Sequence, residues 1–212
     1  MRKTGLLIVI GFILTFNANA KRLKGIIILE DDTLGVTFRI PVTLFAHEIE
    51  FEKIQRKIKY FDTAGKKSVI KPDQAEEIRF YYKNKEIRLL SRFIALRLHD
   101  LFSKNHYYFL KLEMDGKLKL LRYYYTEDSP EVYEASSDVM ITGQSYTVSK
   151  YILQKSDEEL FMPRTLAFRK DMMKYFQDCP ELINMIENRK YRKRDMVNIA
   201  RYYNSYCHIR KS

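Results

Sequence analysis

The two cysteines of the chain, Cys179 and Cys207, constrain its fold more than any other feature, because both lie in a stretch with helical periodicity. Apolar side chains at positions i, i+3, i+4 and i+7 form one face of an α-helix. This spacing occurs twice, in Met172, Tyr175, Phe176 and Cys179, and again in Met196, Ile199, Ala200, Tyr203 and Cys207. The pattern predicts two amphipathic helices, each with a cysteine on its buried face.

The residues between these two faces predict a shorter middle helix, whose apolar side chains are Leu182, Ile183 and Ile186. Pro180 suits its first position, where a helix needs no backbone donor. Asp178 is placed to bond the free amides at that helix end. The basic run that follows lacks a good N-cap, so we expect the last helix to begin near Lys193.

The N-terminus has the pattern of a secretory signal peptide. Arg2 and Lys3 precede an apolar run at 5–16, and residues 18–20 read Ala-Asn-Ala, an A-x-A cleavage pattern. This run is shorter than the roughly 20 residues that a spanning helix needs. We therefore expect cleavage between Ala20 and Lys21, and a mature chain without a transmembrane span that is periplasmic, at the cell surface or secreted.

In an exported chain, two cysteines most simply pair with each other. Closing the loop of about thirty residues between them contributes about 3.5 kcal/mol in the chain-entropy model. A nucleophilic or metal-binding thiol is the alternative, although no CxxC spacing is present and the nearest histidine, His208, follows Cys207. We expect a disulfide that closes the helical segment, residues 166–207.

Residues 24–163 show the alternation and turn signals of β-strands. Strands are predicted at 24–30, 34–40, 68–71, 77–82, 86–91, 107–114, 117–125, 145–154 and 160–162. Asp115-Gly116 is the strongest hairpin signal, because this pair tolerates the positive φ angles of a type I′ turn. The prediction is an α+β fold in which an antiparallel body (24–163) and the helical segment form one domain, 21–212, after a signal peptide at 1–20.

Three stretches of the body are less regular. Residues 48–61 fit both a helix and a strand, and the turn signal at 62–65 favours a strand. Residues 92–106 are predicted to form a short amphipathic helix or an ordered loop. Residues 126–143 are polar and predict a long loop, where function is often located.

The charge of the chain allows several partners and selects none. Its 212 residues carry a formal net charge of +11, and loss of Arg2 and Lys3 with the signal peptide would leave +9. Basic exported proteins can meet anionic lipids, polysaccharide or nucleic acid, but the lysines and arginines are scattered, so solubility is the simpler explanation. The sequence lacks a glycine-rich phosphate loop, a dinucleotide fingerprint and an HExxH motif. It therefore predicts no catalytic residue, no metal ligand and no cofactor, and nucleic acid is not an expected partner.

Cations beside tyrosines on predicted strands are the candidate ligand contacts: Arg79 with Tyr81, and Arg122 with Tyr124. Exposed tyrosines next to cations can stack on sugars or bases. Tyrosine is also a preferred strand residue, and one of each adjacent pair must face the core. Packing is the alternative role for these side chains.

Several segments resemble a family of small exported proteins of Bacteroidetes-type bacteria that has no assigned activity. They are the opening Lys-Gly strand, IRFYYKNKEIRLLS, FLKLEMDGKLKLLRYYYT, SKYILQKSDEEL and the stretch from FRKDMM to YNSYC, of which DCPEL and YNSYC are the most specific. The resemblance implies export and a cysteine pair, and it supplies no catalytic residue.

Together these features predict a non-enzymatic binding or interaction module of the cell envelope, with an envelope protein or polysaccharide as partner. One alternative is a hydrolase of envelope polymers that uses carboxylates the sequence does not single out. A pocket lined by paired carboxylates with a raised pKa would favour it. The other alternative is a basic protein held on anionic lipid or polysaccharide surfaces.

Overall fold

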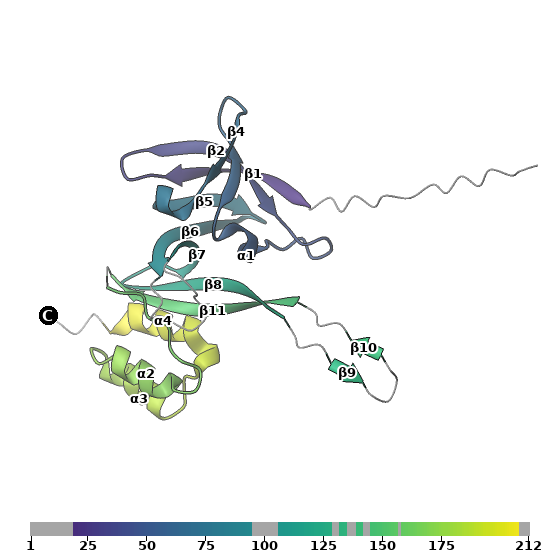
Figure 1. The fold of residues 1–212 in the computed structure, drawn as a ribbon. Helices are drawn as coiled ribbons and strands as arrows, with labels where there is room; N and C mark the ends of the chain where they lie inside the picture. Colours follow the sequence, from purple (N-terminus) through teal and green to yellow (C-terminus); the bar gives the residue numbers. More distant parts are fainter. Residues whose placement is uncertain are drawn as a thin grey trace, which may run out of the picture.

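The computed structural model describes residues 19–94, 106–128, 132–134, 139–141, 145–156 and 158–207. Among these, nine strands form one antiparallel sheet in the order β11-β8-β7-β6-β5-β1-β2-β3-β4 (Figure 1). Residues 1–18 of the predicted signal peptide and residues 95–105 lie outside the described residues. The predicted cleavage point falls at the start of β1, since Ala20 and Lys21 are its first two residues.

The sheet follows the predicted strands closely. Its strands are β1 (Ala20–Ile28), β2 (Thr33–Pro41), β3 (Ile58–Phe61), β4 (Lys67–Ile70), β5 (Glu77–Tyr82), β6 (Lys85–Ile94), β7 (His106–Met114), β8 (Leu118–Asp128) and β11 (Ser145–Lys155). The short 3-10 helix η1 (Pro72–Gln74) precedes β5. The predicted strand at 160–162 is a single bridge between Phe161 and Leu153. The antiparallel α+β prediction is therefore confirmed.

Side-chain alternation places the first core on one face of strands β1 to β7. Ile78 and Phe80 of β5 are fully buried there against Ile27 and Phe38. Gly25 of β1 allows this packing, because a Cβ at that position would lie 2.2 Å from the carbonyl oxygen of Arg79.

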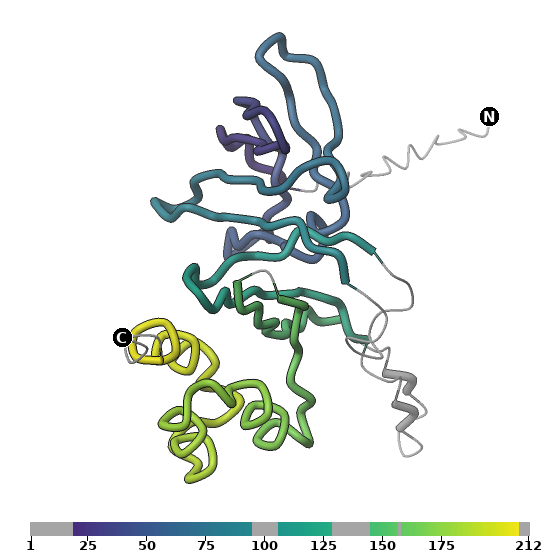
Figure 2. The backbone as a smooth tube through the Cα atoms, turned by 90° about the vertical axis from the view of Figure 1, so that its left-hand side faces the viewer, coloured from purple at the N-terminus to yellow at the C-terminus, as the bar shows by residue number. Residues whose placement is uncertain are grey.

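The helical segment lies at one end of the molecule, against β8 and β11 (Figures 1 and 2). It contains α2 (Phe168–Tyr175), α3 (Pro180–Glu187), the 3-10 helix η3 (Lys193–Asp195) and α4 (Met196–Tyr206). Pro180 opens α3, as predicted. The last helix, α4, begins at Met196, and the 3-10 helix η3 that leads into it begins at the predicted position, Lys193. None of the helices in the described part of the chain is long and apolar enough to cross a membrane.

The predicted disulfide joins Cys179, just before α3, to Cys207, just after α4, with the two Cα atoms 5.3 Å apart. The predicted capping role of Asp178 is wrong. Its carboxylate accepts hydrogen bonds from Lys155 of β11, at 2.7 Å, and from the hydroxyl of Tyr203 in α4. These contacts join the helices to the sheet because Lys155 ends a strand that runs beneath them.

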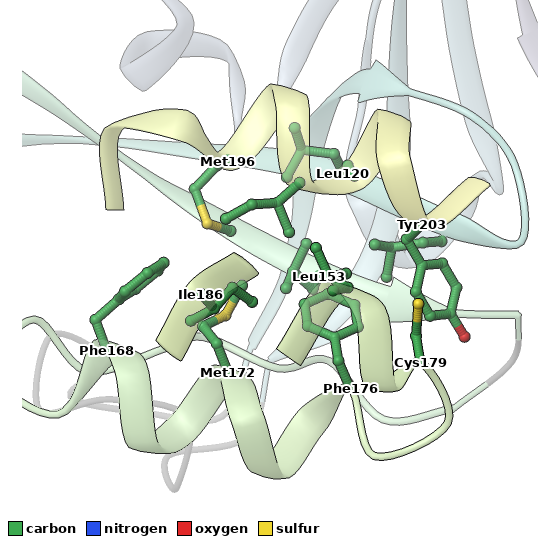
Figure 3. Close-up of a cluster of buried hydrophobic side chains, with 13 residues drawn as sticks. Leu120, Leu153, Phe168, Met172, Phe176, Cys179, Ile186, Met196 and Tyr203 are labelled. Atoms are coloured by element: carbon green, nitrogen blue, oxygen red, sulfur yellow. The ribbon is translucent and has the colours of Figure 1, made fainter. Parts of the chain in front are cut away.

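The helical segment has its own core, shown in Figure 3. Met172, Phe176 and Tyr203 are almost completely buried against Leu120 and Leu153 of the sheet. Full burial of one such side chain contributes about 1.5–3 kcal/mol. The apolar side chains predicted from the i, i+3, i+4 spacing therefore pack the helices on β8 and β11. The predicted first helix is too long, since α2 ends at Tyr175 and Cys179 lies just before α3.

The strand favoured over 48–61 is only partly correct, since α1 (Phe51–Ile54) precedes β3. Buried Gln55 ends this helical turn and lies between β7 and β8. Its backbone carbonyl accepts from Phe109 N–H at 2.9 Å, and its side-chain amide bonds both the N–H and the carbonyl of Tyr124, at 2.7 and 2.6 Å. A side chain thus replaces a stretch of strand pairing, and β7 pairs with β8 only near the hairpin.

Three further expectations need correction. Arg92–Ile94, part of the predicted helix or loop at 92–106, extend β6 because they pair with β7. The loop predicted at 126–143 is replaced in part by strand, since β8 continues to Asp128 and β9 (Val132–Glu134) pairs with β10 (Val139–Ile141). The Asp115-Gly116 hairpin forms, but only Gly116 has positive φ and the ladder contains a bulge, so the turn is not type I′.

Candidate functional site

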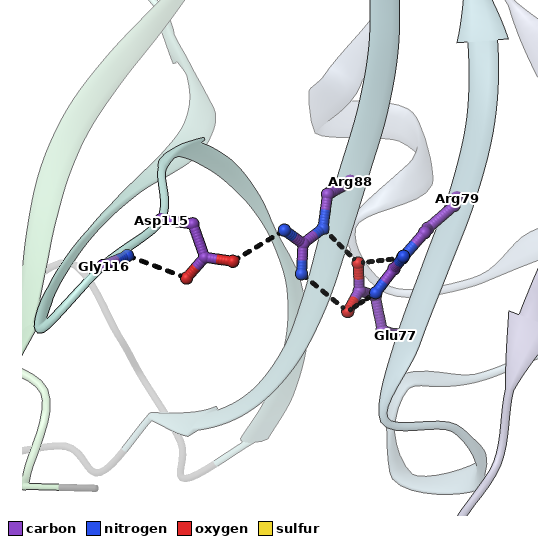
Figure 4. Close-up of polar contacts among 5 residues, drawn as sticks. All are labelled: Glu77, Arg79, Arg88, Asp115 and Gly116. Carbon is purple, nitrogen blue, oxygen red and sulfur yellow. Dashed lines mark hydrogen bonds and ion pairs between the residues drawn. The ribbon is translucent and has the colours of Figure 1, made fainter. Parts of the chain in front are cut away.

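The first pair of predicted ligand contacts, Arg79 and Tyr81, lies on β5. The Arg79 guanidinium is paired with Glu77, at 2.7 Å from Nε to Oε1, and Glu77 also binds Arg88 (Figure 4). Arg88 continues the network to Asp115 at 2.7 Å. Arg79 therefore serves a structural ion network, whereas Tyr81 is 64% exposed.

The second pair, Arg122 and Tyr124, lies on β8. Arg122 forms an ion pair with Glu113, at 3.0 Å from Nε to Oε1, and its guanidinium lies 4.5 Å from the ring centroid of Tyr151 and donates to that hydroxyl. Tyr124 stacks on Phe51 of α1, with 4.7 Å between ring centroids. Burial raises the pKa of the Tyr124 hydroxyl to about 12.

The register separates these two pairs. Arg79 is opposite Arg88 of β6, while Lys111 of β7 is opposite Arg122. Leu90 of β6 is opposite Leu110, so Arg88 and Lys111 lie on different faces of the sheet. The four predicted contacts therefore do not gather on one surface.

A groove of about 420 Å³ lies where β11 meets the helical segment. Its apolar lining includes Met162 and Met196, and Tyr151 forms part of the wall on the sheet. One wall comes from the connection after β11 and another from η3. Lys193 of η3 links the two by donating to Thr165 Oγ1 at 2.8 Å.

Three cations line this groove: Lys150, Lys193 and Arg194. Burial, reinforced by the positive charge of Lys193, lowers the pKa of the Lys150 ammonium. Neighbouring cations repel one another, and a bound anion offsets that repulsion. Methionine side chains adapt to apolar groups of different shape. The groove is suited to an anionic partner that also carries apolar groups.

Sequence reasoning missed this groove. The sequence places Lys193 and Arg194 in a polar connection at the start of the last helix, and Met162 and Lys150 in strands, with no indication that they meet. Their convergence depends on how α4 and the connection after β11 pack against the sheet, for which local periodicity carries no signal. Of the predicted contacts, Arg122 is connected to the groove, because its partner Tyr151 lines it.

A second hollow, of about 290 Å³, contains three carboxylates and Tyr124. Glu48, Glu50 and Glu52 come from the stretch leading into α1. Burial raises the pKa of Glu52, and the charge of Glu50 adds to this. Glu50 itself is ion-paired with Lys53.

The residues that the structure describes include no group of three or more His, Cys, Asp or Glu side chains arranged to hold a metal ion. No protein-family model matches the chain, and no curated protein or solved structure shows significant similarity to it.

Proposed function

We propose that this chain is an exported, non-enzymatic binding module of the cell envelope, and that its binding surface is the groove between β11 and the helical segment. The observation that carries the proposal is the convergence of Lys150, Lys193 and Arg194 around an apolar lining that includes Met162 and Met196. Pockets that combine apolar walls with a few convergent polar groups are the usual place for ligands. The partner is an anionic, partly apolar group of an envelope protein or polysaccharide.

The supporting features form one structural unit. The disulfide holds the C-terminal end of α4 to Cys179, while the N-terminal end of the same helix supplies Met196 to the groove. A groove wall held in place by a crosslink is preorganised, which reduces the entropy lost on binding. The signal sequence and the resemblance to exported proteins support a location outside the cytoplasm.

The test uses 8-anilinonaphthalene-1-sulfonate, a fluorescent anion with apolar rings. We expect saturable binding to the wild type, weakened at least about tenfold in the double variant Lys193→Glu/Arg194→Glu, which corresponds to about 1.4 kcal/mol. The matched control is Lys66→Glu/Lys67→Glu, which changes net charge equally at exposed positions at the start of β4. Equal weakening in both variants would show attraction by net charge alone, and absence of saturable binding would reject the groove.

The acidic hollow favours a second candidate function, hydrolysis of glycosidic bonds. Such reactions need one protonated and one ionised carboxyl group, and a raised pKa at Glu52 beside the paired Glu50 is an arrangement of that kind. If it is correct, the wild type releases reducing ends from envelope polysaccharide and Glu52→Gln does not, while Glu86→Gln, at an exposed position of β6, keeps the activity. A wild type that releases none dismisses this candidate.

A further inference from the structure

β11 is one edge of the nine-stranded sheet and is much longer than the opposite edge strand, β4. An edge strand presents unpaired N–H and carbonyl groups that can pair with another chain. On its outer side, among the described residues, β11 is bridged only at the end near the helical segment, where Leu153 and Phe161 exchange two backbone hydrogen bonds of 2.8 Å. In the remaining stretch, towards Ser145, the groove is lined by Ser149 to Tyr151 and the acidic hollow by Thr147 to Ser149.

The direction of the backbone groups follows from this bridge. Successive residues of a strand direct their N–H and carbonyl groups to opposite sides. The N–H and carbonyl of Leu153 face outward to Phe161, so the N–H and carbonyl groups of Tyr151 and Ser149 face outward as well.

The pairing with β8 gives the same result independently. Ser149 is opposite Tyr124, whose N–H and carbonyl are bonded to Gln55 on the far side of β8. The pair is therefore one of the non-hydrogen-bonded pairs of the ladder, and the backbone groups of Ser149 face away from β8. In the described part of the chain, no backbone group bonds to these outward groups of Ser149 and Tyr151.

The free backbone groups and the cations belong to the same groove, since Ser149 and Tyr151 line it together with Lys193 and Arg194. An extended chain laid along β11 would place alternate side chains on each face of the sheet. Beside Ser149 and Tyr151 the positive charge of Lys193 and Arg194 favours acidic side chains in that chain over basic ones. The carboxylates of the acidic hollow lie beside Thr147 to Ser149, so this preference belongs to the part of the chain next to the groove.

Resting on the proposed function of the groove, we infer that β11 is the receptor strand for β-strand addition. An extended, acidic segment of a partner protein pairs with the outward backbone groups of Ser149 and Tyr151, in line with the short bridge that Phe161 already makes. At about 3.3 Å per residue, the open part of the edge accepts a segment of about six residues. Backbone pairing supplies affinity, and the cations supply the choice of sequence.

The opposing explanation is that Lys150 keeps a long edge from pairing, as lysines on edge strands commonly do. The two explanations differ in one measurable respect: strand addition requires the N–H of Ser149. Proline removes that donor and is tolerated at an edge position whose N–H faces outward.

The probe is a seven-residue peptide of alternating glutamate and valine with blocked ends, titrated by calorimetry into the full mature protein. We expect Ser149→Pro to weaken binding at least about tenfold, the change produced by losing one hydrogen bond together with correct alignment. Ser149→Ala, which keeps the backbone donor, is the matched control and should bind within about twofold of the wild type. Thermal unfolding establishes that both variants are folded.

A second measurement on the wild type covers the case in which Ser149→Pro does not fold. N-methyl groups on one alternating set of peptide residues should abolish binding, and the same number on the other set should leave it nearly unchanged, because only one set faces β11. A peptide in which lysine replaces glutamate should not bind.

The outcomes separate the inference from the function on which it rests. Peptide binding that depends on Lys193 and Arg194 but ignores both Ser149→Pro and N-methylation overturns strand addition and keeps the groove as a charged pocket. Failure of the peptide to bind, while anilinonaphthalene sulfonate still binds the groove, also overturns it and leaves β11 as a protected edge. Failure of both probes removes the proposed function as well.

Discussion

Glu77 shows how a buried charge is held in this sheet. Its carboxylate receives hydrogen bonds from two arginines, Arg79 and Arg88, on neighbouring strands. Burial by itself would raise the pKa of Glu77, but the hydrogen bonds from Arg88 and then Arg79 outweigh burial and lower it below the ordinary 4.5. Glu77 is therefore ionised in the folded protein at neutral pH.

A pH-dependent loss of stability follows from this shift. A carboxyl group with a lower pKa in the folded state stabilises the fold above its unfolded pKa and loses that contribution as pH falls through the folded pKa. We expect Glu77→Gln to lower the free energy of unfolding by about 1.5–3 kcal/mol at pH 7. The difference in unfolding free energy between the wild type and Glu77→Gln should shrink as pH falls below 4.5.

Urea denaturation at a series of pH values measures this difference. The control, Glu86→Gln at an exposed position of β6, should change stability by no more than about 0.5 kcal/mol. A gap between wild type and Glu77→Gln that persists unchanged at pH 3 would contradict the assignment.

Gly25 and Gly35 lie in paired strands and give opposite predictions. A Cβ at Gly25 would meet the Arg79 carbonyl at 2.2 Å and the Phe38 ring at 2.8 Å, whereas nothing lies within 4 Å of a Cβ at Gly35. We expect Gly25→Ala to destabilise the protein by about 1–3 kcal/mol, because backbone and core must shift. Gly35→Ala should be neutral or stabilising by up to about 1 kcal/mol. Equal thermal midpoints for the two variants would contradict this account of the contact between β1 and β5.

At the scale of elements, the helices depend on contacts outside themselves. α2 and α3 are short, and isolated helices of such length are marginal in water. They are held by the core that includes Met172, Phe176 and Leu153, and by the disulfide that closes the chain between residues separated by 28 positions. The crosslink should therefore matter to the whole helical segment.

Removing the crosslink with Cys179→Ala/Cys207→Ala should lower the free energy of unfolding by up to about 3.5 kcal/mol, mainly because the unfolded chain gains freedom. Denaturant titration with and without reductant measures this. Reductant should destabilise the wild type and leave the double variant unchanged. A wild type that melts at the same temperature in both redox states would show that the bond does not stabilise the segment.

At the scale of the whole molecule, processing should leave the sheet intact. Lys21 pairs with Ile40 of β2, so cleavage after Ala20 would remove only the first residue of β1 and the bond from Val42 N–H to Asn19. We expect the chain exported to a bacterial periplasm to have the mass of residues 21–212. Ala18→Asp should block cleavage, because the A-x-A pattern requires a small residue there. An exported chain that retains Met1 would refute the prediction.

Local patterns were sufficient for much of the fold. β5 runs from Glu77 to Tyr82 as predicted, because alternation of Ile78 and Phe80 with polar residues matches the two faces of a strand. Pro180 marked the start of α3 because proline suits a first helical position. The pairing of Cys179 with Cys207 could be predicted because the chain offers no other cysteine.

The sequence by itself determined most of the strands and helices, the faces that β5 and the C-terminal helices bury, and which two cysteines are joined, since period, turn residues and composition act locally. Only the tertiary structure decided that Gln55 completes the contact between β7 and β8, that Arg79 and Arg122 face opposite sides, and that Lys150 meets Lys193 beside the free edge of β11. These features depend on strand order and on how α4 lies across the sheet. Residues far apart in the chain become neighbours there through packing, and no local pattern records which of them will meet.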